Sequence, residues 1–188
     1  PTAYWGASFA AGGWMMQHYW EHYRFTKDKN FLEKRAFPAL HEVALFYSDW
    51  LQTDSRDESL IAYPSTSPEN RYVNQKGIAV ASCKGSAMDQ QVIHEVFTNY
   101  LSAAKELNIE NEVSQKIAKQ LPKLRAGFLL GKDGRILEWD RPYQENEPGH
   151  RHMSHLYGFH PGSQISPNAT PKLFEAVKTT LNYRLANG

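Results

Sequence analysis

Cysteine is nearly absent from this chain: Cys83 is the single example among 188 residues, so no disulfide bond can form within the chain. No stretch approaches about 18 consecutive apolar residues, which excludes a conventional membrane-spanning helix. A large net charge is also missing, because 21 basic side chains are balanced by 20 acidic ones. This balance gives no reason to expect a nucleic acid or a membrane surface as a partner.

The start of the chain lacks a methionine and a charged, apolar leader, since it begins at Pro1. We therefore expect a piece of a longer protein. The composition is that of a folded protein, with 41% hydrophobic and 13% aromatic residues, and 188 residues suffice for one region with a substantial core. The five Trp and ten Tyr residues offer many flat surfaces for stacking.

Apolar residues recur at helical spacing over five ranges, which predicts a mainly α-helical fold. The ranges are 8–25, 31–52, 86–107, 111–124 and 171–186. Asp28 is expected to cap the second helix, and Pro38 to kink it or to start a new segment. Gly12 and Gly13 weaken the first helix and suit close packing against a neighbour. In the last helix, the expected inward positions are Leu173, Val177, Leu181 and Leu185.

Two long loops, 53–85 and 125–170, separate these helices, whereas the other connections are short. The second loop contains a predicted β-hairpin over 127–139, with its turn at Lys132-Asp133-Gly134. If the helices alternate in direction, both long loops lie at one end, together with the segment around Trp5. Because long loops inside a compact domain are usually functional, this end is the expected location of a site.

The first long loop contains the stretch "PSTSPENRY", residues 64–72. Each proline fixes its own backbone and restricts the residue before it, so the approach to Glu69 is expected to be stiff. The aromatic residues around the stretch, such as Tyr63 and Tyr72, are unusual for a solvated linker. An ordinary turn with a surface Glu69 and Arg71 is the alternative.

The second long loop contains four histidines within eleven positions: His150, His152, His155 and His160. Their spacing does not match the helical pair of known zinc motifs, so a metal site is not favoured. Recognition of a polyhydroxyl compound is a second interpretation, in which Trp139 and Tyr157 provide flat faces for a sugar ring. A third is a buried polar network that holds the loop together, a role expected for His155 and His160.

Three further side chains near these loops are open to more than one interpretation. Asp89 lies in the first turn of the third helix. Its carboxylate either stabilises the helix through a favourable interaction with the helix dipole or faces the expected site. Glu138 and Trp139 end the predicted hairpin and either point to solvent or meet a sugar. Cys83 has no histidine or base close in sequence and is expected to be structural.

Several stretches of this chain resemble glycoside hydrolase family 95, whose best-known activity is that of an α-1,2-L-fucosidase. They are "GGWMMQHYWEHYRFTKDKNFL", "YPSTSPEN", "AMDQQVIHEVFTN", "GRILEW" and "HRHMSHLYGFHPG". The resemblance covers nearly the whole chain. It implies a fragment of an (α/α)6 barrel of twelve helices, in which about five to six helices carry long loops and a small hairpin at one end. Residues 1–188 would then form one helical region of a larger catalytic domain.

The resemblance also implies roles for individual residues. The family cleaves with inversion, and the glutamate of its SPEN segment is the general acid, which maps onto Glu69. The Arg-His pair of its HRH segment binds fucose, which maps onto Arg151 and His152. We add Trp139, Asp89 and Asn70 to the expected substrate-binding set. The implied partners are a fucosylated oligosaccharide or glycan and the remainder of the parent catalytic domain, with no metal or cofactor, and the parent enzyme is expected to be secreted or periplasmic.

This chain departs from the family's pattern in what it omits. The family activates the attacking water with asparagines upstream of this region and an aspartate downstream of it, and neither segment is present. The chain therefore resembles the acid half of an inverting α-L-fucosidase. The competing hypothesis is a non-catalytic helical carbohydrate-binding or scaffold module.

Overall fold

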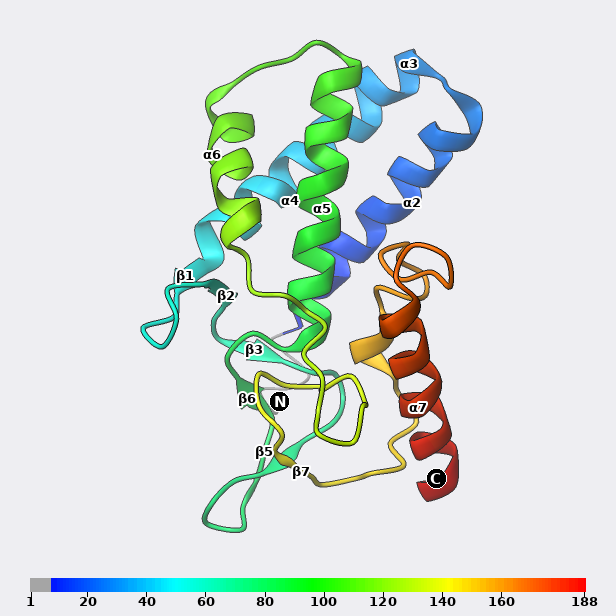
Figure 1. Ribbon diagram of the computed structural model, residues 1–188. Coiled ribbons are helices and arrows are strands. Elements are labelled where there is room, and N and C mark those ends of the chain that lie inside the picture. The colour runs from blue at the N-terminus through cyan, green and yellow to red at the C-terminus, as the bar shows by residue number, and fades with distance from the viewer. Residues whose placement is uncertain (1–7) are drawn as a thin grey trace. The chain divides into compact units, whose positions relative to one another are not determined.

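A computed structural model describes residues 8–188, and the described chain is mainly helical (Figure 1). The α-helices are α2 (Ala10–Thr26), α3 (Lys29–Phe31), α4 (Phe37–Trp50), α5 (Ala87–Glu106), α6 (Glu112–Gln120) and α7 (Pro171–Asn187). A π-helical segment, Leu32–Ala36, joins α3 to α4, and short 3-10 helices cover Leu121–Lys123 and Ser154–Leu156. None of the described helices is long and apolar enough to cross a membrane.

The ends of these helices follow local chemistry that the sequence predicts. The Asp28 side chain accepts a hydrogen bond of 3.0 Å from the backbone N–H of Phe31, as expected for an N-cap. Pro38 stands at the start of α4, directly after the π-helical segment. Because proline has no backbone N–H to donate, the α-helical ladder cannot continue through it unchanged. The expected break in the second helix is therefore confirmed.

The chain divides into two compact units, which we describe separately. The first unit includes Ala62–Gln91 and Ala126–Gly188, and the second consists of Phe9–Ile61 and Val92–Arg125. Helix α5 begins in the first unit and continues into the second. The segment around Trp5, which we expected near the long loops, lies outside the described residues.

The second unit has a core built on the apolar stripe of α5. Val96, Phe97 and Tyr100 of this stripe are buried. Gly13 of α2 packs closely in this unit: a Cβ atom added to it would lie 2.3 Å from Val92 and 2.6 Å from the Tyr47 hydroxyl. The expectation that a glycine of the first helix permits close packing is therefore confirmed at this position.

The first unit combines helix α7 with short strands and long loops. The strands are β3 (Ser65–Thr66), β4 (Tyr72–Val73), β5 (Ala79–Val80), β6 (Ser82–Cys83) and β7 (Gln144–Glu145), while β1 (Leu51–Thr53) and β2 (Leu60–Ala62) form a separate pair. β4 pairs with β5 on one side and with β7 on the other, which places Tyr72 opposite Glu145. The two long loops are thus joined into one sheet. The core of the first unit is formed by a separate apolar cluster: Ile136, Leu156, Ile165, Ala176 and Val177.

Two expectations in the first unit are corrected. The hairpin over 127–139 keeps its turn, where Gly134 has φ +80°, but it forms only a single bridge between Leu130 and Ile136. The bridge is held by hydrogen bonds from the Gly131 N–H to the Arg135 carbonyl and from the Leu137 N–H to the Leu129 carbonyl, while the Ile136 N–H donates to the Thr180 hydroxyl of α7, at 3.0 Å. Leu185 of α7 is 72% exposed, whereas its neighbour Arg184 is buried. A buried carboxylate, described below, holds Arg184 on the inward side.

Candidate active site

The loop Ser65–Asn70, here called the acid loop, is held in place by its own polar side chains. Ser65, Ser67 and Asn70 are buried, and the N–H of Asn70 donates to the carbonyl of Ser67 at 2.9 Å. The Ser65 hydroxyl donates to Asp89 at 2.6 Å and accepts from the backbone of Ser86 at 2.9 Å. The stretch that contains Glu69 is therefore a fixed loop and not a solvated linker.

The acid loop presents Glu69 to two cationic side chains from the second long loop. A Glu69 carboxylate oxygen accepts a hydrogen bond from the guanidinium of Arg151, 82 residues later in the sequence. The same oxygen lies 3.2 Å from Nε2 of His152. The Glu69 side chain is 18% exposed, whereas those of Arg151 and His152 are 70% and 47% exposed. The structure thus brings these three predicted residues together at a surface open to a ligand.

The segment that carries Arg151 and His152 is fixed by contacts on both sides. The hydroxyl of Ser154 donates to the carbonyl of Pro68 in the acid loop. Nδ1 of His150, a buried side chain, accepts from the backbone N–H of His152 at 3.1 Å. The segment therefore contacts the acid loop directly and has little freedom to move away from it.

The remaining histidines of this segment do not form a metal site in the described residues, where no cluster of His, Cys, Asp and Glu side chains could hold an ion. His155 is fully buried, and burial lowers its pKa to about 4. Its backbone carbonyl accepts from the side chain of Gln91 at 2.8 Å, and Gln91 also bonds Gly127 and Gly158. The backbone of His155 is thus part of a buried polar network, whereas its Nδ1 atom has no hydrogen-bond partner among the described residues and His160 is exposed, so the third interpretation holds only in part.

Asp89, a predicted substrate-binding residue, lies behind the acid loop and not at its surface. It is fully buried at the start of α5, and burial raises the pKa of its carboxyl group to about 7, against the opposing hydrogen bond from Ser65. In this arrangement Asp89 supports strand β3 of the acid loop, and a ligand at Glu69 would not touch it.

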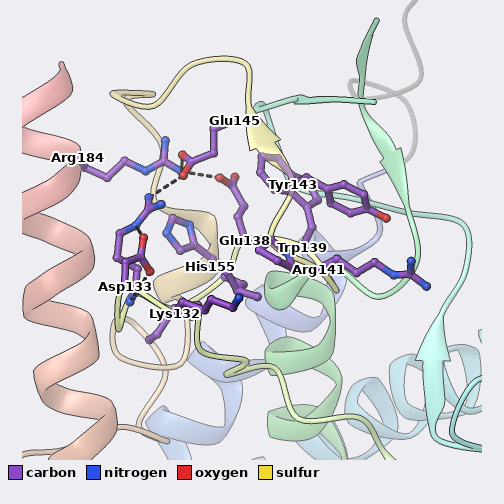
Figure 2. Close-up of a pocket in the computed structure, with 14 residues that line it drawn as sticks. Lys132, Asp133, Glu138, Trp139, Arg141, Tyr143, Glu145, His155 and Arg184 are labelled. Atoms are coloured by element: carbon purple, nitrogen blue, oxygen red, sulfur yellow. Dashed lines mark hydrogen bonds and ion pairs between the residues drawn. The ribbon is translucent and has the colours of Figure 1, made fainter. Parts of the chain in front are cut away.

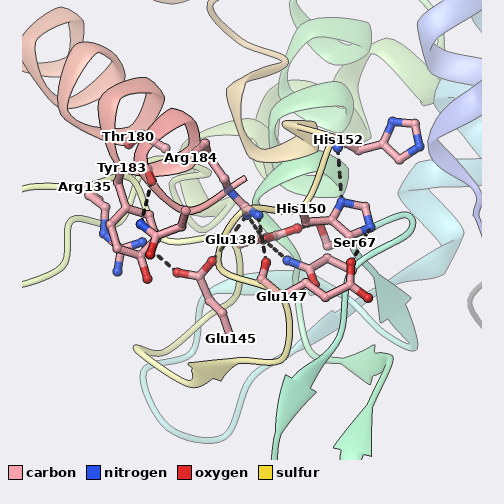
Figure 3. A network of polar contacts seen from close by, with 12 residues as sticks. Ser67, Arg135, Glu138, Glu145, Glu147, His150, His152, Thr180, Tyr183 and Arg184 are labelled. Carbon is pink, nitrogen blue, oxygen red and sulfur yellow. Dashed lines mark hydrogen bonds and ion pairs between the residues drawn. The ribbon is translucent and has the colours of Figure 1, made fainter.

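Glu138 is a second buried carboxylate behind the acid loop (Figure 3). One of its oxygens accepts from the Ser67 hydroxyl at 2.7 Å, and the other accepts from the Asn70 amide at 2.9 Å. Arg184 of α7 forms a buried ion pair with the second oxygen. Asn70, predicted to bind substrate, therefore directs its amide inward to Glu138. Arg184 is a residue that sequence reasoning missed, because nothing in its local pattern marks it as buried.

Trp139 is also turned into the protein, where it packs edge-on against Tyr72 with ring centroids 5.5 Å apart. It lines a cavity of about 390 Å³ (Figure 2), together with Tyr143, His155 and Arg184. The cavity includes Glu138, so it adjoins the carboxylate that holds the acid loop. Trp139 therefore offers no face to a ligand at Glu69.

Comparison with known proteins identifies the family to which this site belongs. Residues 2–188 match the model described as the glycosyl hydrolase family 95 catalytic domain. The chain belongs to glycoside hydrolase family 95. It is 38% identical over 190 residues to Alpha-L-fucosidase 2 of Arabidopsis thaliana. It is also 29% identical over 192 residues to Probable alpha-fucosidase A of Aspergillus niger, and 32% identical over 171 residues to the protein of the same name from Aspergillus oryzae.

The family 95 chain spans only part of these relatives. The alignments cover 99%, 97% and 81% of this chain, but 22%, 23% and 22% of the respective relatives. The chain therefore corresponds to less than a quarter of a family 95 protein of that size.

Proposed function

We propose that this chain is the part of an inverting α-L-fucosidase catalytic domain that carries the general acid, Glu69, and part of the fucose site, Arg151 and His152. The observation that carries the proposal is the meeting of these three side chains at one exposed surface. Membership of family 95 and the names of the related fucosidases support the choice of reaction and substrate. The substrate class is a fucosylated oligosaccharide or glycan.

The proposed reaction requires Glu69 to give its proton to the glycosidic oxygen as the bond from that oxygen to the anomeric carbon breaks. A water molecule then attacks the anomeric carbon from the opposite face and loses its proton to a base. The aglycone leaves as a neutral alcohol, and the sugar leaves with inverted configuration. Within this scheme Glu69 must hold a proton when the substrate is bound.

The ion pair between Glu69 and Arg151 is therefore a feature of the substrate-free site. A carboxylate that is paired with a guanidinium is in its charged form and has no proton to give. Arg151 and His152 are exposed enough to turn toward a sugar. We infer that the hydroxyl groups of the fucose draw both side chains from Glu69, which leaves the carboxyl group free to act as an acid.

The base of this reaction is expected from the remainder of the parent domain. Asp89, Glu138 and Asp140 are three acidic residues of the first unit that could be considered for this role, and the side chains of all three are buried. An inverting enzyme holds its acid and base roughly 6.5–9.5 Å apart with a water between them. A buried side chain behind the acid loop cannot occupy that position across the sugar ring.

The parent domain also completes the proposed fold. We propose that the helical segments of this chain are a contiguous part of an (α/α)6 barrel and that residues 1–188 form one region of it. The long loops would lie at the end of the barrel where the substrate enters. No metal or cofactor is required by the proposed chemistry, because a carboxylic acid and a carboxylate base suffice.

The test is the Glu69→Gln variant of the intact catalytic domain, assayed with two substrates. General acid catalysis typically contributes 10²–10⁴-fold, so kcat on an α-1,2-fucoside should fall by at least about 100-fold. The loss on α-L-fucosyl fluoride should be much smaller, because fluoride leaves without a proton. Glu175→Gln, on the exposed side of α7, is the matched control and should leave both rates unchanged. Equal losses on both substrates would contradict the role of Glu69 as the acid.

A further inference from the structure

The buried ion pair between Glu138 and Arg184 contacts both of the loops that form the candidate active site. We propose that this pair positions the acid loop and the Arg151–His152 segment relative to each other, and so sets the reach of Glu69 to the glycosidic oxygen. The inference rests on the proposed function, since it concerns the alignment of a general acid. Neither residue touches the substrate in this account, so both are positioning residues.

The first part of the argument is the way in which Glu138 holds the acid loop. Its two oxygens accept from Ser67, two residues before Glu69, and from Asn70, one residue after it. The carboxylate therefore fixes the backbone on both sides of the acid. Because the two donors are themselves buried, a shift of Glu138 would move the Glu69 side chain with it.

The second part is the way in which Arg184 reaches the other loop. One of its guanidinium nitrogens pairs with Glu138, and another donates to the backbone carbonyl of Glu147 at 3.2 Å (Figure 3). The same carbonyl accepts from the backbone N–H of His150 at 3.0 Å. His150 in turn holds the backbone of His152. A short series of hydrogen bonds thus connects Arg184 to the predicted sugar-binding pair.

The third part is burial, which makes the pair rigid. The side chains of Arg184 and Glu138 are 2% and 3% exposed. Removing one partner would leave an unpaired buried charge, which strongly destabilises a protein. Replacing both partners with apolar side chains of similar size often leaves the free energy of unfolding unchanged or higher. A double replacement can therefore remove the link between the two loops while the protein stays folded.

The experiment uses the intact catalytic domain with the double variant Glu138→Leu/Arg184→Met. A displacement of about 1 Å at a reacting group can cost 10²-fold, so kcat on an α-1,2-fucoside should fall about 10- to 100-fold. The kcat on α-L-fucosyl fluoride should change less than about threefold, since that substrate needs no proton. KM should rise for both substrates, because the sugar-binding segment is also released. A merely structural defect would lower the activity on both substrates equally.

Two further variants make the result specific. The matched control is Asp54→Leu/Arg125→Met, which removes a buried ion pair of 2.6 Å in the second unit. This control should show no difference between the two substrates. Ser67→Ala removes one contact to the acid loop and leaves the Glu138 ion pair intact. It should lower kcat on the fucoside about tenfold or less without raising KM, and it decides the question if the double variant does not fold.

The outcomes separate this inference from the proposed function. If Glu69→Gln distinguishes the two substrates but neither the Glu138→Leu/Arg184→Met nor the Ser67→Ala variant does, the positioning role is wrong and the proposed acid stands. If Glu69→Gln loses activity equally on both substrates, the proposed function and the positioning role fail together. Equal effects of the two double variants would also overturn the positioning role.

Discussion

Two buried titratable groups of the first unit should give the domain's stability opposite dependences on pH. Burial raises the pKa of Asp89 from 3.8 to about 7 and lowers that of His155 from 6.5 to about 4. Both shifts keep the side chain neutral in the folded protein across the intervening range of pH. The free energy of unfolding then changes with pH wherever the folded and unfolded states bind different numbers of protons.

The signs follow from which state holds the proton. Between pH 4 and 7 the folded state keeps the Asp89 proton that the unfolded chain has lost, so stability falls as pH rises. Each pH unit between two pKa values corresponds to about 1.4 kcal/mol, which gives a loss of roughly 3 kcal/mol between about pH 5 and pH 7.5. His155 has the opposite effect, because over the same range the unfolded chain binds a proton at His155 and the folded protein does not. The free energy of unfolding therefore rises with pH by about 2 kcal/mol.

Two variants of the intact catalytic domain, Asp89→Asn and His155→Gln, each replace one of these titratable groups with a side chain that does not titrate. The contributions of the two groups nearly cancel in the wild type. Asp89→Asn should therefore leave a free energy of unfolding that increases by about 2 kcal/mol from pH 5 to pH 7.5, and His155→Gln one that decreases by roughly 3 kcal/mol. Urea unfolding followed by tryptophan fluorescence measures both. If Asp89→Asn keeps the pH dependence of the wild type, the reasoning about its buried carboxyl group is wrong.

Two further predictions concern packing and the isolated chain. Gly13→Ala should destabilise the domain by about 1–3 kcal/mol in chemical unfolding, because the new Cβ meets Val92 and Tyr47. Gly12→Ala, whose Cβ finds its nearest contact at 3.9 Å, should stabilise it by up to about 1 kcal/mol, and equal effects at the two positions would refute this account of the packing. The isolated 188-residue chain should release no fucose and should self-associate in sedimentation velocity through faces such as that of Phe46, which is 46% exposed. Robust turnover by a monomer would mean that a base lies within these residues.

The helices could be predicted from sequence because their signals are local. The periodicity of apolar residues, the Asp28 cap and the break at Pro38 depend on neighbours within a few positions. The sequence predicted from connection lengths that the two long loops lie at one end, but not that they pair, because strands as short as β4 and β7 carry too few residues for an alternating pattern. The hairpin over 127–139 reflects the same limit, since it forms only one bridge beside its turn.

The site could be predicted only in part. Glu69, Arg151 and His152 were found because whole motifs surround them, and the structure brings them together. Asn70 and Trp139 stand in the same motifs but face inward, since motif membership does not reveal which way a side chain points. The burial of Arg184 was not foreseen, because it depends on a carboxylate 46 residues away in sequence.

The measurement that tests the central claim most directly is a crystal structure of the intact Glu69→Gln catalytic domain with an uncleaved α-1,2-fucoside. Our account predicts that the side chain at position 69 lies within about 2.6–3.2 Å of the glycosidic oxygen. It also predicts that Arg151 and His152 have left that side chain and bind hydroxyl groups of the fucose. A fucose bound elsewhere, or one bound while Arg151 still contacts position 69 and the glycosidic oxygen stays out of reach, would contradict it.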